Sequence, residues 1–365
     1  MSQLKPIDGT ELNEYVINLL HKNNISTGSD FLRLEDVKLS KITNLPETQI
    51  AAIKIKLRRV FGPQVVDALY YCSPAWKIKY TTGIESLDSL IGNEFRPGRI
   101  YEICGYSATG KSIFCTTIAL NFVQNHSADV IYLDTKRDFS GTRMHRMLQA
   151  RKLSKDEIGR IMQKIIVQRC YNLRELINVL ENLLEGLKNK KLTAKLVIVD
   201  SLPSVWYLFH GEDGSKKGKS LLTQCANLLK QIAKEHQLLV ICVNVMVRNI
   251  SEQEPMTAMD MEDRLDLAGN QLQQHQRQLE QPLHSLTKPS LGKCWDAVPT
   301  IRFTIEDPFY EAMLNEVSTT NRTAEQARTS AEAIDKNQRI VRVAKSCFTS
   351  TGSECTVRVG DIGMH

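Results

Sequence analysis

The residues from 105 to 112 have types and a spacing that suit phosphate chemistry. They read Gly105-Tyr106-Ser107-Ala108-Thr109-Gly110-Lys111-Ser112, two glycines with four residues between them, followed by a lysine and a serine. The glycines let the main chain curl so that its amide groups point at a phosphate. The Lys111 ammonium can reach the β and γ phosphates, and the Ser112 hydroxyl can ligate Mg²⁺. This segment predicts a site for a nucleoside triphosphate such as ATP.

The segments on either side of this glycine loop favour the same interpretation. Residues 101–104 read as a strand, and residues from 113 onward read as a helix. The positive end of such a helix points at a bound anion. A glycine turn without a ligand shares the short pattern, but the order of strand, loop and helix favours the phosphate site.

A second candidate for the same site is Asp200. It follows the apolar run 196–199, so it lies at the carboxyl end of a predicted buried strand. There its carboxylate can support Mg²⁺ opposite Ser112. Many buried strands end in an aspartate, so Asp200 alone does not indicate a Mg²⁺ site. Its position after the glycine loop, in the expected order along the chain, is what favours this interpretation.

The elements that must position these residues alternate along the chain. Strands are predicted at 100–104, 130–133, 165–168, 196–199 and 238–243, and helices at 111–123, 173–187 and 221–235. Strands separated by helices predict an α/β fold with a mainly parallel sheet flanked by helices.

The chain divides into three predicted parts. Residues 1–60 have apolar residues at helical spacing and predict a small all-α domain. Residues 61–78 contain prolines and a glycine and predict a linker. Residues 79–365 form the predicted core, interrupted by flexible insertions at about 250–287 and 307–338, which are polar and low in large apolar residues.

The composition excludes several classes of protein. Hydrophobic residues make up 42% and charged residues 24% of the 365 residues, which is typical of a soluble globular protein and not of a disordered chain. We expect no membrane span and no signal peptide. The 9 cysteines form no CxxC pair, which argues against a zinc finger or disulfide scaffold and favours a reducing compartment. The net charge of +6 permits a nucleic-acid partner.

Two further segments carry a resemblance to a known family. Residues 81–92 read TTGIESLDSLIG, similar to the T-G-x-x-x-L-D-x-L-x-G run before the phosphate loop of RecA-like strand-exchange recombinases. Residues 291–295 read LGKCW, similar to the later G-[KR]-x-W segment of that family. The resemblance covers 79–249 and 288–363 well and 12–60 weakly. Over 340–363 as well as the core, the chain is similar to the D-type paralogues of the eukaryotic recombinase.

This resemblance implies a RecA-type phosphate-loop core that uses ATP and Mg²⁺ and acts in homologous recombination. Paralogues of this type work in heteromeric complexes with other paralogues and bind single-stranded or branched DNA. They support repair of double-strand breaks, crosslinks and stalled forks, so the resemblance implies a nuclear protein with no membrane partner.

The resemblance also assigns roles to residues around the loop. The family's water-activating glutamate corresponds to Lys136, and lysine is a poor base because it is cationic near neutral pH. We therefore name no catalytic residue and expect weak, DNA-dependent ATP hydrolysis. Arg143 matches an arginine that stacks on adenine, although a solvated arginine at a helix start explains it equally well. Asn244 matches a γ-phosphate sensor, but Val245 replaces its polar partner.

Other basic residues are candidates for intersubunit or DNA contacts. Lys345 matches basic residues that reach a neighbour's nucleotide, although the polar face of an edge strand is an equal alternative. Two segments are candidates for contact with DNA phosphates, although either could simply be a solvated surface. The first is a predicted flexible loop at 210–220, with the cations Lys216, Lys217 and Lys219. The second is a predicted helix at 50–60, with Lys54, Lys56, Arg58 and Arg59. The insertion at 252–286 has seven acidic residues against two arginines, a net charge of −5, and would repel phosphate.

Three functions remain open from the sequence. The first is an ATP-binding and DNA-binding subunit of a paralogue complex. The second is a self-assembling strand-exchange ATPase, which the lysine at position 136 and the acidic insertion disfavour. The third is a protein scaffold without useful nucleotide binding, which the intact loop at 105–112 disfavours.

Overall fold

The computed structural model describes residues 4–7, 9–61, 78–92, 95–207, 214–248, 287–310, 312 and 335–365. The chain divides into two compact units, residues 1–73 and residues 74–365. Nearly all of the predicted linker and the first predicted insertion, and most of the second, lie outside the described residues.

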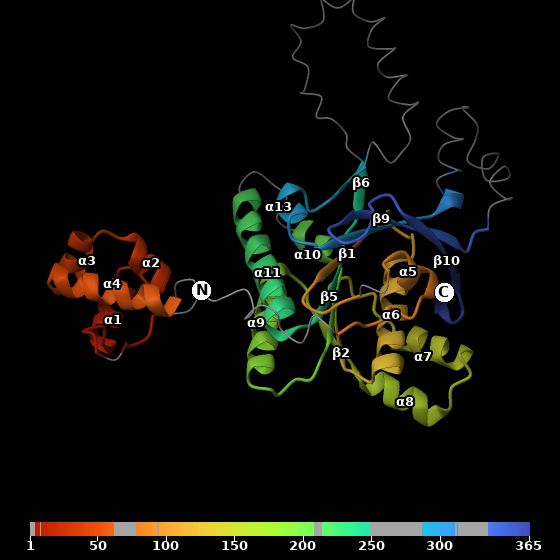
Figure 1. Cartoon of the computed structure of the whole chain (residues 1–365), viewed down its shortest axis with the longest axis horizontal. Coiled ribbons are helices and arrows are strands. Elements are labelled where there is room, and N and C mark those ends of the chain that lie inside the picture. The colour runs from red at the N-terminus through yellow and green to blue at the C-terminus, as the bar shows by residue number, and fades with distance from the viewer. Residues whose placement is uncertain are drawn as a thin grey trace, which may run out of the picture. The chain divides into compact units, whose positions relative to one another are not determined.

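The first unit is a small bundle of helices with its own core. Its helices are α1 (Glu14–Lys22), α2 (Gly28–Arg33), α3 (Asp36–Thr43) and α4 (Glu47–Phe61) (Figure 1). Thr27 and Asp30 form a capping box that starts α2, which fixes where the second helix begins. Apolar residues from all four helices are buried together, including Leu20, Phe31, Leu39, Ile53 and Leu57. This burial is what the helical spacing of apolar residues predicts.

The second unit is built on one large sheet. Among the described residues nine strands pair in the order β11-β10-β9-β8-β1-β5-β4-β2-β3. The six strands from β8 to β3 in this order are parallel: β8 (Ile301–Glu306), β1 (Ile100–Cys104), β5 (Leu239–Val243), β4 (Leu196–Asp200), β2 (Val130–Asp134) and β3 (Ile165–Arg169). The other three are antiparallel: β9 (Gln338–Ser346), β10 (Glu354–Gly360) and β11 (Gly363–Met364). A separate two-stranded ribbon joins β6 (Met246–Arg248) and β7 (Thr287–Pro289).

Helices cover both faces of this sheet (Figure 1). One face carries α5 (Glu85–Leu90), α6 (Lys111–His126), α7 (Gly141–Ala150) and α8 (Lys155–Gln163). The other face carries α9 (Leu173–Lys188), α10 (Leu202–Trp206), α11 (Gly214–His236) and α13 (Lys293–Asp296).

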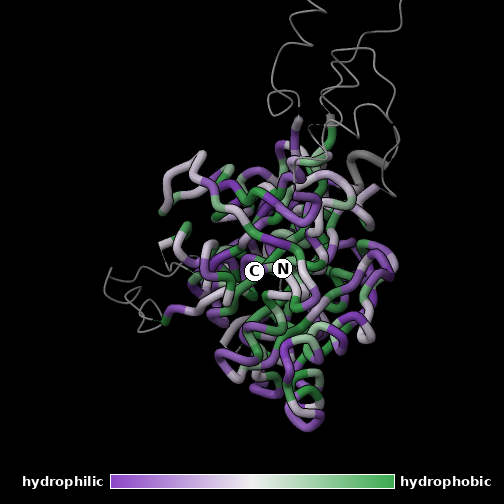
Figure 2. The backbone as a smooth tube through the Cα atoms, turned by 90° about the vertical axis from the view of Figure 1, so that its right-hand side faces the viewer, coloured by the Kyte–Doolittle hydropathy of each residue, from purple (hydrophilic) through white to green (hydrophobic). Residues whose placement is uncertain are grey.

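The alternation of side chains in the strands explains why two cores form. In β2, Val130 and Tyr132 pack on the α6 face, while Ile131 and Leu133 pack on the α9 face. A strand buried on both sides reads as a continuous apolar run, and Figure 2 shows hydrophobic stretches through the middle of the second unit. The carboxyl ends of the parallel strands all meet at one edge, where ligands bind in folds of this class.

Candidate nucleotide-binding site

The glycine loop lies between the carboxyl end of β1 and the start of α6. A Cβ atom on Gly105 would lie 2.5 Å from the carbonyl oxygen of Ile305, so no larger residue fits there. Gly110 has a φ of +95° and Ala108 a φ of +66°, which are left-handed conformations. The loop is therefore tightly curled, as a phosphate-binding loop requires.

Lys111 is held inside this loop. Its side chain is buried, and its ammonium donates to the carbonyl oxygen of Gly105 at 2.9 Å and to that of Tyr106. Burial, and next the nearby charge of Lys136, lower the pKa of Lys111 to about 8, while the Asp200 carboxylate acts in the opposite direction. An ammonium kept here by neutral carbonyls is well placed to exchange them for a phosphate.

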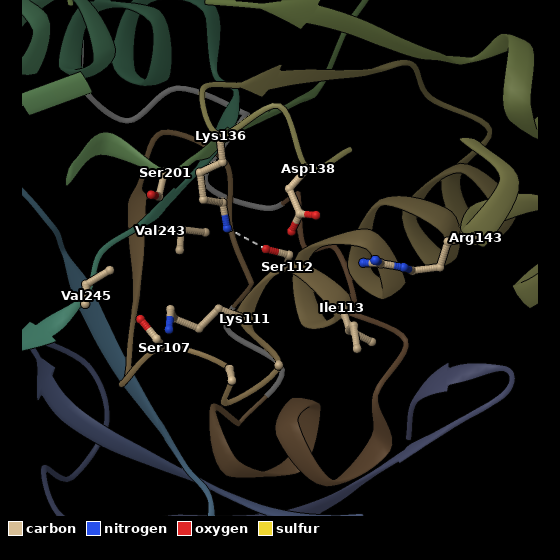
Figure 3. Close-up of a pocket in the computed structure, with 12 residues that line it drawn as sticks. Ser107, Lys111, Ser112, Ile113, Lys136, Asp138, Arg143, Ser201, Val243 and Val245 are labelled. Carbon is tan, nitrogen blue, oxygen red and sulfur yellow. Dashed lines mark hydrogen bonds between the residues drawn. The ribbon is translucent and has the colours of Figure 1, made fainter. Parts of the chain in front are cut away.

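A cavity of about 270 Å³ opens beside the loop. It is formed by the loop, the first turn of α6, the segment after β2, the start of α7 and the carboxyl ends of β4 and β5 (Figure 3). The 16-residue helix α6 directs its positive end at this cavity. A curled loop, a buried lysine and a helix N-terminus are the groups that bind a triphosphate, so the residues present fit this ligand.

Arg143 also lines the cavity. It lies in the first turn of α7, where its main-chain amide donates to the Ser140 hydroxyl at 3.2 Å. Its guanidinium extends from α7 toward the start of α6 (Figure 3). This position is compatible with the predicted stacking on adenine, which stays a prediction.

The two predicted Mg²⁺ ligands are brought together, but a lysine lies between them. The Lys136 ammonium donates to the Ser112 hydroxyl at 2.7 Å and lies 2.8 Å from Asp200 Oδ1. The first of these contacts is dashed in Figure 3. Asp200 Oδ2 accepts a hydrogen bond from the buried Tyr132 hydroxyl, and Oδ1 has the Lys136 ammonium as its ion-pair partner. A divalent cation does not fit between Ser112 and Asp200 while the ammonium is there.

The carboxylate of Asp134 organises the segment that carries Lys136. Its Oδ1 accepts the main-chain amides of Lys136 and Asp138, and its Oδ2 accepts that of Phe139. With three main-chain donors and almost full burial, Asp134 is a structural residue and a poor candidate for a base. Asp138 is the acidic residue among the described residues that line the cavity.

Asn244 occupies a buried polar network behind the cavity. Its amide donates to Glu102 Oε1 at 2.7 Å, and its oxygen accepts the Ser290 hydroxyl at 2.8 Å. Val245, not Asn244, lines the cavity. The predicted role of Asn244 in sensing the γ phosphate stays a prediction, and the structure adds that its side chain already has hydrogen-bond partners.

Sequence reasoning missed the centre of this network, Glu102. The carboxylate is fully buried, accepts the Trp295 indole at 2.9 Å and pairs with Arg302, which also contacts Asp296. The signal that identifies it is a single acidic residue in the otherwise apolar run 100–104. The sequence analysis names Trp295 only as part of the segment 291–295. Its hydrogen bond to Glu102 gives that segment a structural role.

The basic residue proposed for intersubunit contact, Lys345, has hydrogen-bond partners in its own chain. The Lys345 ammonium donates to the carbonyl oxygens of Asp296 and Pro299, the latter at 2.9 Å. Its proposed reach to a neighbour's nucleotide would require these bonds to be replaced and stays a prediction.

The predicted basic face of α4 needs a correction. Lys54 is buried, and its ammonium pairs with Asp36 at 2.5 Å, so it stabilises the first unit and does not face solvent. Lys56 is half-buried and donates to the carbonyl oxygen of Gly9 at 2.8 Å. Arg58 and Arg59 are exposed. Lys54 and Arg58 are four residues apart and therefore share a side of the helix, but this spacing does not show that Lys54 packs inside.

The predicted basic loop at 210–220 also needs a correction. Residues 214–220 are the first turns of α11, which begins seven residues before the predicted start at 221. Lysine tolerates a helix well, so the lysines extend the amphipathic helix despite the neighbouring glycines. Lys219 is exposed, and Lys216 and Lys217 lie in the same helix. Residues 210–213 lie outside the described residues.

The comparisons with known proteins agree with this geometry. A model of the Rad51 family matches residues 75–284. "DNA repair protein RAD51 homolog 4" of Bos taurus is 24% identical over 358 residues, which cover 96% of this chain and 93% of that protein. "DNA repair and recombination protein RadB" of Pyrococcus furiosus is 30% identical over 164 residues, which cover 45% of this chain and 66% of RadB.

A solved structure is also similar. The crystal structure of the RadB recombinase aligns with a TM-score of 0.52 at 18% identity, covering 78% of this chain and 97% of that chain. This likeness concerns the fold. Together with the family model, it confirms the predicted RecA-type α/β class and the predicted resemblance.

Proposed function

The chain belongs to the Rad51 family, and on that premise we propose that it is an ATP-binding, DNA-binding subunit of a complex of recombinase paralogues. One observation carries the nucleotide part of this proposal. The curled loop, the buried Lys111, the N-terminus of α6 and Arg143 all meet around a single cavity. The names of the similar proteins supply the repair and recombination part.

In the proposed complex with ATP, each group has a separate task. The main-chain amides of 107–112 bind the phosphate oxygens, and Lys111 exchanges its carbonyl partners for a phosphate. Arg143 places its planar guanidinium against the base, an arrangement that suits arginine better than lysine. ATP supplies the polyanion that this cationic cavity is built to bind.

We propose that hydrolysis is weak and that ATP acts mainly as an assembly switch. Two features support this. Lys136 stands where the family has its water-activating glutamate, and Asp134 is fully engaged with main-chain amides. No step of this proposal requires Mg²⁺, because the Lys136 ammonium lies between Ser112 and Asp200.

The finer cellular role is also a proposal. The complex would act in homologous recombination repair of double-strand breaks, crosslinks and stalled forks, in the nucleus, on single-stranded or branched DNA. Other recombinase paralogues are the proposed partners. In the described part of the chain, no helix has the length and apolar character needed to cross a membrane.

Thermal unfolding with and without ATP tests the nucleotide site. At about 100 times its Kd, ATP should stabilise the native chain by about 2.7 kcal/mol. This corresponds to a rise in Tm of several degrees for a unit of this size. Lys111→Ala should remove that rise because the phosphates lose their buried cation.

A matched control uses Lys155, an exposed lysine at the start of α8. Lys155→Ala should keep the full ATP-dependent rise in Tm. If ATP leaves the Tm of the unmodified chain unchanged, the scaffold function becomes the better account. If the isolated chain forms filaments on single-stranded DNA in electron micrographs, the self-assembling strand-exchange ATPase becomes the better account.

A further inference from the structure

We propose that the Lys136 ammonium takes the place of the divalent cation in this site, so that the chain binds a nucleoside triphosphate without Mg²⁺. This inference rests on the proposed ATP binding and specifies how the site meets the charge of the phosphates. The family position held by a glutamate would thereby supply a positive charge instead of a base.

The positions of three side chains carry the proposal. A divalent cation at a phosphate loop needs the hydroxyl after the loop lysine and the carboxylate at the end of the facing strand. Here these groups are Ser112 Oγ and Asp200 Oδ1, and one ammonium contacts both, at 2.7 and 2.8 Å. The Asp200 side chain is only 4% exposed, so its charge needs a counter-ion inside the protein, and Lys136 is that counter-ion.

The segment after β2 keeps Lys136 in this position. Its main-chain amide is bound to the buried Asp134 carboxylate at 3.1 Å, and the amides of Asp138 and Phe139 are bound to the same side chain. The main chain is thus fixed at the carboxyl end of β2, next to β4. The Lys136 side chain is 29% exposed and lines the cavity, so its charge is accessible to a ligand there.

The charges around the cavity suit a triphosphate that carries no metal. Lys111, Lys136 and Arg143 line it, against Asp138 as the acidic residue among its described lining. Mg²⁺ binds oxygen ligands at about 2.0–2.1 Å in octahedral geometry, and a protonated amine cannot coordinate it because it has no free lone pair. A bound Mg²⁺ would therefore have to displace the ammonium from Asp200 and would then face its repulsion.

The first experiment measures the Kd of a fluorescent ATP analogue for the purified full chain, with excess MgCl₂ and with excess EDTA. We expect the Kd in EDTA to be no more than about threefold higher than the Kd in MgCl₂. Binding that weakens by more than this in EDTA would overturn the proposal. An absence of binding in both buffers would instead overturn the proposed nucleotide site itself.

The second experiment assigns the effect to Lys136. Lys136→Met keeps the length of the side chain and removes its charge, so that Asp200 faces the phosphates without a counter-ion. In this variant EDTA should weaken binding by about tenfold or more, while MgCl₂ should restore it. If Lys136→Met binds equally well in both buffers, metal independence does not come from Lys136 and the proposal is wrong.

Arg137 provides a matched control. It is the neighbouring cation, but its guanidinium lies over the Tyr171 ring, 4.4 Å from the ring centroid, and it does not line the cavity. Arg137→Met should leave the ratio of the two Kd values as in the unmodified chain. If Lys136→Met does not fold, Lys136→Gln replaces it, and the comparison on the unmodified chain is unaffected.

Discussion

At the scale of the residue, one substitution changes the chemistry of the site. Lys136 contacts Ser112 and Asp200 through its ammonium, so the position to which the resemblance assigns water activation carries a positive charge. The carboxylate two residues earlier, Asp134, cannot replace the missing base because main-chain amides occupy it. Asp138 is the one acidic side chain that the described part of the chain places on the cavity lining.

We therefore predict slow turnover of ATP. Phosphate release by the purified chain, with partner subunits and DNA, should stay well below about 1 per second, the lower end of common enzyme rates. Asp138→Asn should reduce any residual rate further, because it removes the acidic side chain among the described residues that line the cavity. A rate of about 1 per second or more would contradict the weak-hydrolysis proposal.

At the scale of the element, the buried carboxylate of Glu102 links the central strand β1 to neighbouring elements. Glu102 in β1 contacts Asn244 after β5, Trp295 in α13 and Arg302 in β8. These bonds connect β1, in the middle of the sheet, to the end of β5, to α13 and to β8. A buried charge with several partners is costly to disturb because its partners lose their bonds together.

Glu102→Gln should consequently lower the free energy of unfolding by about 3 kcal/mol or more, measured by urea denaturation. The comparison variant is Glu354→Gln, which removes an exposed carboxylate on β10 from its pair with Arg342 on β9. That change should cost less than about 1 kcal/mol because solvent screens the pair. Similar losses for the two variants would show that the buried network adds little stability.

A second element-scale prediction concerns the start of α8. Ser154 and Glu157 form a capping box, and the hydrogen bonds from Ser154 hold the pKa of Glu157 below its usual value of 4.5. The carboxylate therefore stabilises the fold above the unfolded-state pKa, and this contribution disappears as the pH falls through the lower folded-state pKa.

Ser154→Ala removes the hydroxyl donor, so the pKa of Glu157 should rise toward 4.5. An NMR titration of the Glu157 carboxyl measures this directly. An unchanged pKa in the variant would mean that the hydroxyl does not contribute, and that the main-chain amide of Ser154 alone lowers the pKa.

At the scale of the whole molecule, the cations available for DNA are fewer than the sequence suggests. Lys54 is buried against Asp36, whereas Arg58 and Arg59 on α4 and Lys219 on α11 are exposed. Contacts between such cations and phosphates release counter-ions, so their strength depends on salt.

Binding to single-stranded DNA should weaken clearly between about 50 and 200 mM salt and should not depend on base sequence. Arg58→Glu combined with Arg59→Glu should weaken binding further in a fluorescence anisotropy titration. Lys41→Glu, a charge reversal at another exposed position of the first unit, should have a smaller effect. Binding that is insensitive to salt would argue against a phosphate-dominated mode.

Much of the architecture is predictable from local patterns. The strands β1 to β5 lie within one residue of their predicted bounds. Four of them, β1, β2, β4 and β5, are buried at every residue, and such strands read as almost continuous apolar runs. The sequence analysis does not predict the helices α7 and α8 or the strand β10, which lies between β9 and β11. These elements are short, with 10, 9 and 7 residues, and each buries at most three side chains, so few apolar positions mark them in the sequence.

The sequence by itself determined the fold family, and it predicts the ligand class. The loop 105–112, its neighbouring strand and helix, and the order of Asp200 are local features, and local spacing is what a sequence records. Only the tertiary structure decided which charges meet. Parallel pairing brings the ends of β2 and β4 together, and this places the Lys136 ammonium between Ser112 and Asp200. Such a contact joins residues distant in the chain, so it depends on the packing of the sheet and not on spacing.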